Sequence, residues 1–169
     1  METLKKVMCV AVFLGLGVQP EAFSQEVPPD QALELRQAVT AWLECEECTE
    51  GQLEAVLRLG ELAVPSLGAA LERGPSPASL ERLQMHLERN YREMSVYAET
   101  HDEVKMDFKL EEYVKIYLEN YVASHRARAA EALGKIGGES AKARLEAASR
   151  LKLRSDVLAV VRESANKAR

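Results

Sequence analysis

Residue types that usually carry chemistry are scarce in this chain of 169 residues. It has three cysteines and three histidines, and aromatic residues make up 5% of it. No glycine-rich phosphate loop, nucleophile elbow or metalloprotease motif occurs. No segment alternates apolar and polar residues as a half-buried strand does. These absences argue against the motif-defined enzyme classes and against a sheet, and we expect no catalytic site, no cofactor and no metal.

The N-terminus has the order of features found in secretory signal peptides. Lys5 and Lys6 precede an apolar run over residues 7–18, and a small-residue cleavage site follows at residues 22–24. The run is too short for a membrane-spanning helix, which takes about 20 residues. We therefore predict a signal peptide over residues 1–24, a periplasmic or secreted location, and no membrane span after cleavage.

The predicted mature chain, residues 25–169, is rich in Ala, Leu, Glu and Arg, which favours helices. Its charge is unevenly distributed. Residues 25–125 carry 9 Lys and Arg against 20 Asp and Glu, a net charge of −11, whereas residues 126–169 carry 11 against 5, a net charge of +6. The chain is long enough for one domain with a real core, and we expect that domain to be acidic at one end and basic at the other.

Capping and turn residues predict three short helices in the first half of the mature chain. Asp30 is placed to cap the first, Thr49 and Gln52 form a capping box for the second, and Pro65 suits the first turn of the third. The helices are expected over residues 30–44, 50–60 and 65–73. Tight turns between short helices imply antiparallel neighbours.

Apolar residues at steps of three and four then predict a long helix over about 79–98, and such a stripe needs a long partner. A second continuous apolar face over 110–136 supplies it. We expect a long helical hairpin, followed by a reversal at Gly137 and Gly138. Two further helices are expected over 139–150 and from 155 or 156 to near the end.

The segment AAEALGKIGGESAKARLEAA at 129–148, followed by DVLAVVRESA at 156–165, resembles the HEAT-like repeat of the phycobilisome lyase type. Residues 57–67 look like a shorter copy of the same inter-helix turn. The resemblance implies a short all-α solenoid, with repeat-like copies at about 50–73 and 120–150 and the hairpin at about 79–136 between them. It implies a surface for holding a protein partner. Bilin lyase activity is not expected, because the export signal separates the chain from pigment assembly.

Cys45 and Cys48 are the only cysteines of the predicted mature chain and form a Cys-Glu-Glu-Cys motif. A structural disulfide fits an exported protein. A redox-active pair is the second interpretation, although the neighbouring glutamates disfavour a thiolate. A zinc site would need two more ligands. The disulfide is our prediction, with the other two as alternatives.

The three histidines are scattered. His125 lies on the apolar stripe of the longest predicted helix, where we expect a hydrogen-bonded core histidine. His86 falls off the buried stripe of its helix. A metal site from His101, Asp102 and Asp107 is conceivable, but solvated loop charge accounts for these residues.

Two sets of side chains are candidates for binding. Tyr113 and Tyr117 lie one helical turn apart, and packing inside the hairpin is the default interpretation. The alternative is that both remain partly exposed and anchor a partner. A basic C-terminal set would steer an acidic partner or remain a solvated face. The set comprises Lys142, Arg144, Arg150, Lys152 and Arg154.

The sequence therefore predicts a noncatalytic protein-binding scaffold of the cell envelope or the exterior. One alternative is a thiol-disulfide protein that acts through Cys45 and Cys48. Another is a structural homo-oligomer that joins the acidic end of one copy to the basic end of the next. Nucleic acid is disfavoured as a partner by the predicted export and by the net charge of −5.

Overall fold

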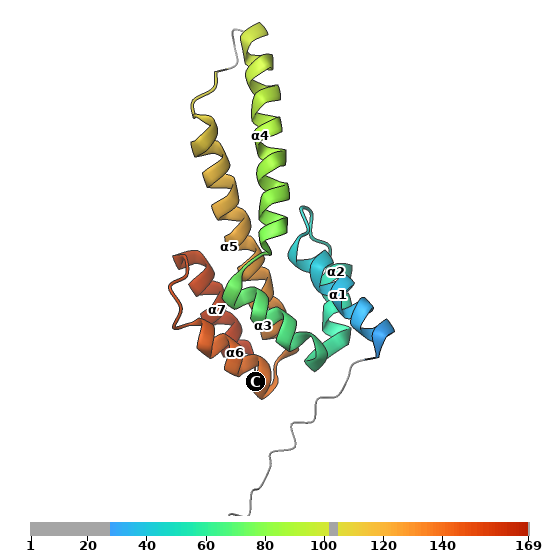
Figure 1. The fold of residues 1–169 in the computed structure, drawn as a ribbon. Helices are drawn as coiled ribbons and strands as arrows, with labels where there is room; N and C mark the ends of the chain where they lie inside the picture. Colours follow the sequence, from blue (N-terminus) through green and yellow to red (C-terminus); the bar gives the residue numbers. More distant parts are fainter. Residues whose placement is uncertain (1–27, 102–104, 169) are drawn as a thin grey trace, which may run out of the picture.

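A computed structural model describes residues 28–101 and 105–168. Within these ranges the chain is all helical, with seven α-helices, one short 3-10 helix and no strand (Figure 1). The helices are α1 (Pro29–Leu43), α2 (Glu50–Leu59), η1 (Gly60–Ala63), α3 (Val64–Arg73), α4 (Pro77–Thr100), α5 (Leu110–Ile136), α6 (Gly138–Ala148) and α7 (Ser155–Lys167). The predicted signal peptide, residues 1–24, lies outside the described residues.

The molecule has two parts that share one helix. The base consists of α1, α2, α3, α6, α7 and the C-terminal half of α5. The arm consists of α4 and the N-terminal half of α5, residues 77–101 and 105–124, and projects from the base (Figure 1). Because α5 packs against α1, α2, α3, α4, α6 and α7, it is the central element of both parts.

The local signals for helix ends act largely as expected. The backbone N–H of Thr49 donates to Gln52 Oε1 at 2.8 Å, and Gly60, with φ 53°, follows the end of α2. The predicted cap at Asp30 is wrong. α1 begins at Pro29, because the fixed φ of proline suits the first helical position, and Asp30 therefore lies inside the first turn.

The base has a closely packed core in which alanine lets helices approach one another. Ala129, Ala130 and Ala132 on α5 are completely buried. At Gly134 the approach is closer still, because a Cβ atom there would lie 2.7 Å from the Cβ of Ser164 on α7. The largest fully buried side chains are Val56, Val64, Leu67, Leu71, Leu133, Leu145, Val157 and Val161.

The arm has a much smaller core. Its buried residues are Leu87, Tyr113 and Val114, and partly buried residues surround them at Leu83, Tyr91, Leu110 and Leu118. The apolar stripe predicted on α4 is therefore buried in its middle and less buried toward the tip. Met94, which continues this stripe toward the tip, is 37% exposed.

The expected hairpin and the reversal after it are both confirmed. α4 and α5 pack along each other, and Gly137 and Gly138 adopt φ values of 70° and 80° between α5 and α6. In the described part of the chain, no helix is both long enough and apolar enough to cross a membrane.

Candidate functional site

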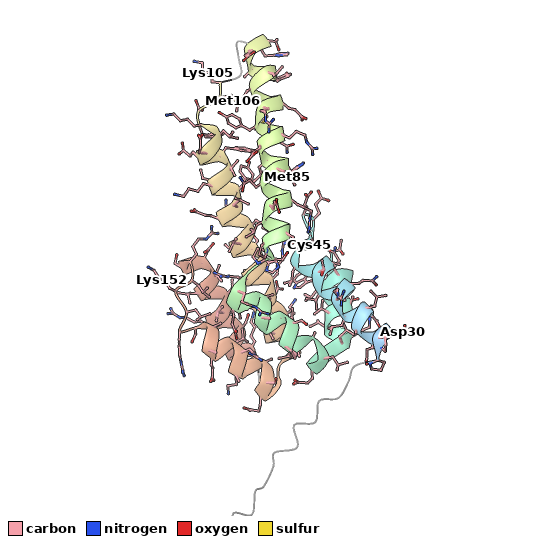
Figure 2. All side chains as sticks on the ribbon, viewed as in Figure 1. Asp30, Cys45, Met85, Lys105, Met106 and Lys152 are labelled. Atoms are coloured by element: carbon pink, nitrogen blue, oxygen red, sulfur yellow. A yellow bond between two sulfur atoms is a disulfide. The ribbon has the colours of Figure 1, made fainter. Side chains whose placement is uncertain are left out.

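A cleft of about 480 Å³ opens where the arm leaves the base. The end of α1, the α1–α2 connection, α4 and α5 form its walls. Figure 2 shows Cys45, one of the lining residues, close to the foot of α4. The lining residues are Glu44, Cys45, Glu46, Ser79, Arg82, Leu83, His86, Tyr117, Asn120, Tyr121, Ser124 and Arg128.

A polar network joins the base to the foot of α4 inside this cleft. The Ser79 hydroxyl donates to Glu44 Oε1 at 2.7 Å, and Arg82 Nη2 donates to Ser79 Oγ at 3.1 Å. Ser79 is 6% exposed, and its hydroxyl is occupied on both sides. Its role is therefore to hold α4 against α1, because a buried and bonded hydroxyl is not available to attack a substrate.

Two hydrogen bonds fix α1 to α5 behind the cleft. Trp42 Nε1 donates to the carbonyl of Arg128 at 3.0 Å, and Arg128 Nη1 donates to the carbonyl of Leu43 at 3.0 Å. Burial lowers the pKa of Arg128 from its usual value, and burial raises the pKa of Tyr121, with the charge of Glu44 acting in the same direction. The back wall is thus rigid and carries polar groups with reduced solvation.

His125 lies in the core behind the cleft with 5% of its surface exposed. The expectation of a buried histidine is confirmed, whereas one of its two ring nitrogens, Nδ1, has no hydrogen-bond partner among the described residues. Burial lowers the pKa of His125 to about 4, the Glu44 carboxylate opposes this shift, and the charges of Arg128 and Arg126 reinforce it. The imidazole is therefore neutral at neutral pH.

The predicted disulfide is present at the rim of the cleft. Cys45 and Cys48 are bonded with their Cα atoms 5.2 Å apart, and Cys48 is exposed. The bond closes the turn between α1 and α2, which carries Glu44 and Glu46 into the cleft. The position of the disulfide fits a structural role, since the bond holds this wall of the cleft in place.

The two candidate tyrosines lie in different environments. Tyr113 follows the default interpretation of packing inside the hairpin, and the alternative of partial exposure is wrong for it, because 7% of its surface is exposed. Its ring packs 5.5 Å from Tyr91 and 6.2 Å from Phe108, measured between ring centroids. Tyr117 is 50% exposed and lines the cleft, so the arm keeps one of the two available to a partner.

The basic C-terminal residues do not line this cleft. Arg144 Nη1 contacts Glu72 Oε1 at 3.3 Å. Arg154 binds Asp156 through two hydrogen bonds, of 2.8 and 2.6 Å, and donates to Asn120 Oδ1. Lys142 is half-buried, whereas Arg150 and Lys152 are exposed. Two of the five residues therefore form ion pairs within the chain, which leaves less of their charge to act on a partner.

The cleft as a unit has no signature in the sequence, because residues far apart along the chain form it. Glu44 and Ser79 are 35 residues apart, and Trp42 and Arg128 are 86 apart. Such pairs have no local signal in the sequence. The metal interpretation gains no support from His101, whose ring stacks on Tyr97, and Asp102 lies outside the described residues. Within the described ranges, no group of three His, Cys, Asp or Glu side chains is placed to hold a metal ion.

Comparison with protein-family models, curated proteins and solved structures found no match.

Proposed function

We propose that this protein is an exported, noncatalytic protein-binding module. In this proposal the base is a HEAT-like helical support, and the arm with the cleft at its foot is the binding surface. The observation that carries the proposal is the distribution of exposed apolar side chains. Seven of the ten large apolar residues exposed in the described part of the chain lie on the arm: Met85, Met94, Val96, Tyr97, Phe108, Ile116 and Tyr117.

Exposed apolar groups concentrated on one projecting element are typical of a surface that a partner covers. Tyr117 is the best-placed anchor, because its half-exposed ring lies at the cleft and tyrosine combines a large contact area with few rotatable bonds. Arg82 and Glu46 border the same cleft and can pair with charges on a partner. Met85 projects from the arm above the cleft (Figure 2).

A photocrosslinking experiment tests the proposal. A benzophenone amino acid replaces Tyr117 in one variant and the equally exposed Leu33, on the base, in a control variant. We expect one discrete adduct from a periplasmic extract of the host at Tyr117 and none at Leu33. The captured protein, once purified, should bind Tyr117→Ala at least about tenfold more weakly than the unmodified chain, which is a loss of about 1.4 kcal/mol. Equal labelling at both positions would contradict the proposal.

The exposed Cys48 beside the cleft supports a second candidate function, thiol-disulfide exchange with a partner. Glu46, Glu47 and Glu50 surround this site with negative charge, which disfavours the thiolate that exchange requires. Replacing both cysteines by serine separates the two functions. Binding by the captured partner should persist if the arm is the binding surface, and it should be lost if exchange is the function.

A further inference from the structure

A second, mostly apolar groove runs along the opposite face of the arm, in the seam between α4 and α5. Its lower part has a volume of about 460 Å³ and reaches α7 at Val157. Its upper part, about 510 Å³, continues toward the tip, and both parts share Gln84, Leu118 and Glu119. The groove is thus continuous along the seam and ends at the base.

α5 supplies a regular row of apolar side chains to this groove. They are Leu110, Val114, Leu118 and Val122. A spacing of four residues places them on one face of the helix, one turn above another. Val114 is buried in the arm core, whereas Leu118 and Val122 are only partly buried. A row of this kind in an open groove is the surface that packs against another helix.

The groove has opposite charges at its two ends. Glu111 is exposed at the tip end, and Arg126 borders the base end. Arg126 donates through Nη2 to the carbonyl of Glu72 at a long 3.4 Å, and its Nε is buried without a partner among the described residues. Arg154 also borders the base end, but Asp156 and Asn120 occupy its guanidinium. Of the two arginines at this end, Arg126 therefore makes fewer hydrogen bonds within the described residues and is the one left to pair with a partner's carboxylate.

These charges are arranged almost symmetrically about Leu118. At a rise of 1.5 Å per residue, Glu111 lies about 10.5 Å from Leu118 toward the tip, and Arg126 lies about 12 Å away toward the base. A helix that fits the groove antiparallel to α5 needs an apolar row with an acidic residue at one end and a basic residue at the other. α5 itself has this pattern.

We propose that two copies of the chain associate through this groove, with their α5 helices antiparallel around a two-fold axis at Leu118. Val114 of each copy then lies against Val122 of the other, and Leu118 packs against its counterpart. Arg126 of each copy pairs with Glu111 of the other. The arrangement is isologous, so it closes at a dimer and forms a four-helix bundle from two arms.

This interface is on the face of the arm opposite the cleft, so the inference is independent of the proposed function. α4 separates the two faces, since Leu83 and His86 line the cleft, whereas Leu80 and Gln84 line the groove. A dimer of this form leaves Tyr117 of each copy available. It also differs from an association of acidic and basic ends, because the pairing charges lie within one groove.

Charge reversal tests the pairing by sedimentation velocity of the full chain over a range of concentrations. We expect a concentration-dependent dimer for the unmodified chain. Glu111→Arg and Arg126→Glu should each weaken it at least about tenfold, because each places like charges opposite one another. The double variant should recover an affinity within about threefold of the unmodified chain, since the pair is restored with its signs exchanged.

Glu112→Arg is the matched control. It makes the same charge change in the same exposed turn of α5, but it lies outside the groove, so the dimer should be unaffected. Far-UV circular dichroism verifies that each variant is folded. An unmodified chain that remains monomeric at about 100 μM, or a double variant no tighter than the singles, would overturn the proposal.

A crosslink gives a second and independent measurement. Because the two-fold axis passes Leu118, Leu118→Cys should form a disulfide-linked dimer under mild oxidation. Ile116→Cys, which is exposed on the same helix but does not line the groove, should form far less. Equal crosslinking by both variants would show nonspecific collision and would contradict the proposed axis.

Discussion

The base and the arm use the same helix in different ways. In the base, α5 is covered on most sides by neighbours that include α3 and α7, and Ala129, Ala130 and Ala132 have no exposed surface. In the arm, α5 has α4 as its only long neighbour, and the buried core shrinks to Leu87, Tyr113 and Val114. The difference shows that a continuous helix does not distribute stability evenly. Stability follows the number of faces that are covered, and the arm is accordingly free to expose its apolar side chains.

The largest effect should come from removing a side chain at the centre of the base. Leu133→Ala is expected to lower the free energy of unfolding by about 2–5 kcal/mol, because Leu133 is fully buried among helices that cannot close the cavity. Leu87→Ala in the arm should cost about 2 kcal/mol, the low end of that range, because two helices can relax toward solvent. Urea unfolding measures both. An equal or larger loss at Leu87 would mean that the arm is as tightly packed as the base.

Acid should weaken the junction of the two parts through His125. Its pKa is about 4 in the folded chain and about 6.5 when unfolded, so the unfolded chain binds more protons between these values. The contribution of His125 to the free energy of unfolding is therefore fully present above pH 6.5. It is lost as the pH falls toward 4 and amounts to about 3 kcal/mol in total. Replacing His125 by Phe should flatten this part of the stability profile.

Removing the disulfide should have an intermediate effect that is confined to the base. The chain-entropy model gives about 2 kcal/mol for a loop this short. Cys45→Ser combined with Cys48→Ser should therefore lower stability by about that amount, measured by thermal unfolding under oxidising conditions. Adding a reductant to the unmodified chain should reproduce the loss. Hydrogen exchange in the upper arm should not change, and faster exchange there would show that the rim of the cleft also supports the tip.

The smallest expected effect is at the start of α4. Ser76 caps this helix by accepting a hydrogen bond from the backbone N–H of Ser79 at 3.1 Å. Ser76→Ala should cost about 1 kcal/mol and speed hydrogen exchange in the first turn of the arm. Ser76→Asp keeps an acceptor at the cap and should behave like the unmodified chain. A loss with Asp as large as with Ala would indicate that the bond between the hydroxyls of Ser76 and Ser79 matters more than the cap.

Helix positions were predictable because their signals are local. The capping box at Thr49 and Gln52, the turn at Gly60 and the reversal at Gly137 act within a few residues of where they occur. The hairpin was equally predictable, since two apolar stripes of similar length can be buried by packing on each other. The cap predicted at Asp30 is wrong, because α1 begins at Pro29 and its N-cap is Pro28, two positions earlier.

The candidate site was harder to predict from the sequence, because contacts between residues far apart in the chain determine which side chains are exposed. A spacing of four residues places Tyr113 and Tyr117 on one face, but it does not reveal that Tyr91 and Phe108 cover the first of them. Likewise, the sequence does not reveal that the charge of Arg144 is paired with Glu72, which lies 72 residues away along the chain. Sequence patterns predicted which side chains share a helix face, and the tertiary contacts determined which of them are open to a partner.

α5 is one uninterrupted helix that connects the tip of the arm to the core of the base. It contains no proline, and its single glycine, Gly134, lies close to its C-terminal end, so about 40 Å of helix runs from the tip of the arm into the core without a joint. α4 meets the base through the turn at Gly74 and Pro75 and through the hydrogen bond from Ser79 to Glu44. A force applied at the tip would therefore reach the base along α5, where α3 and α7 pack against this helix.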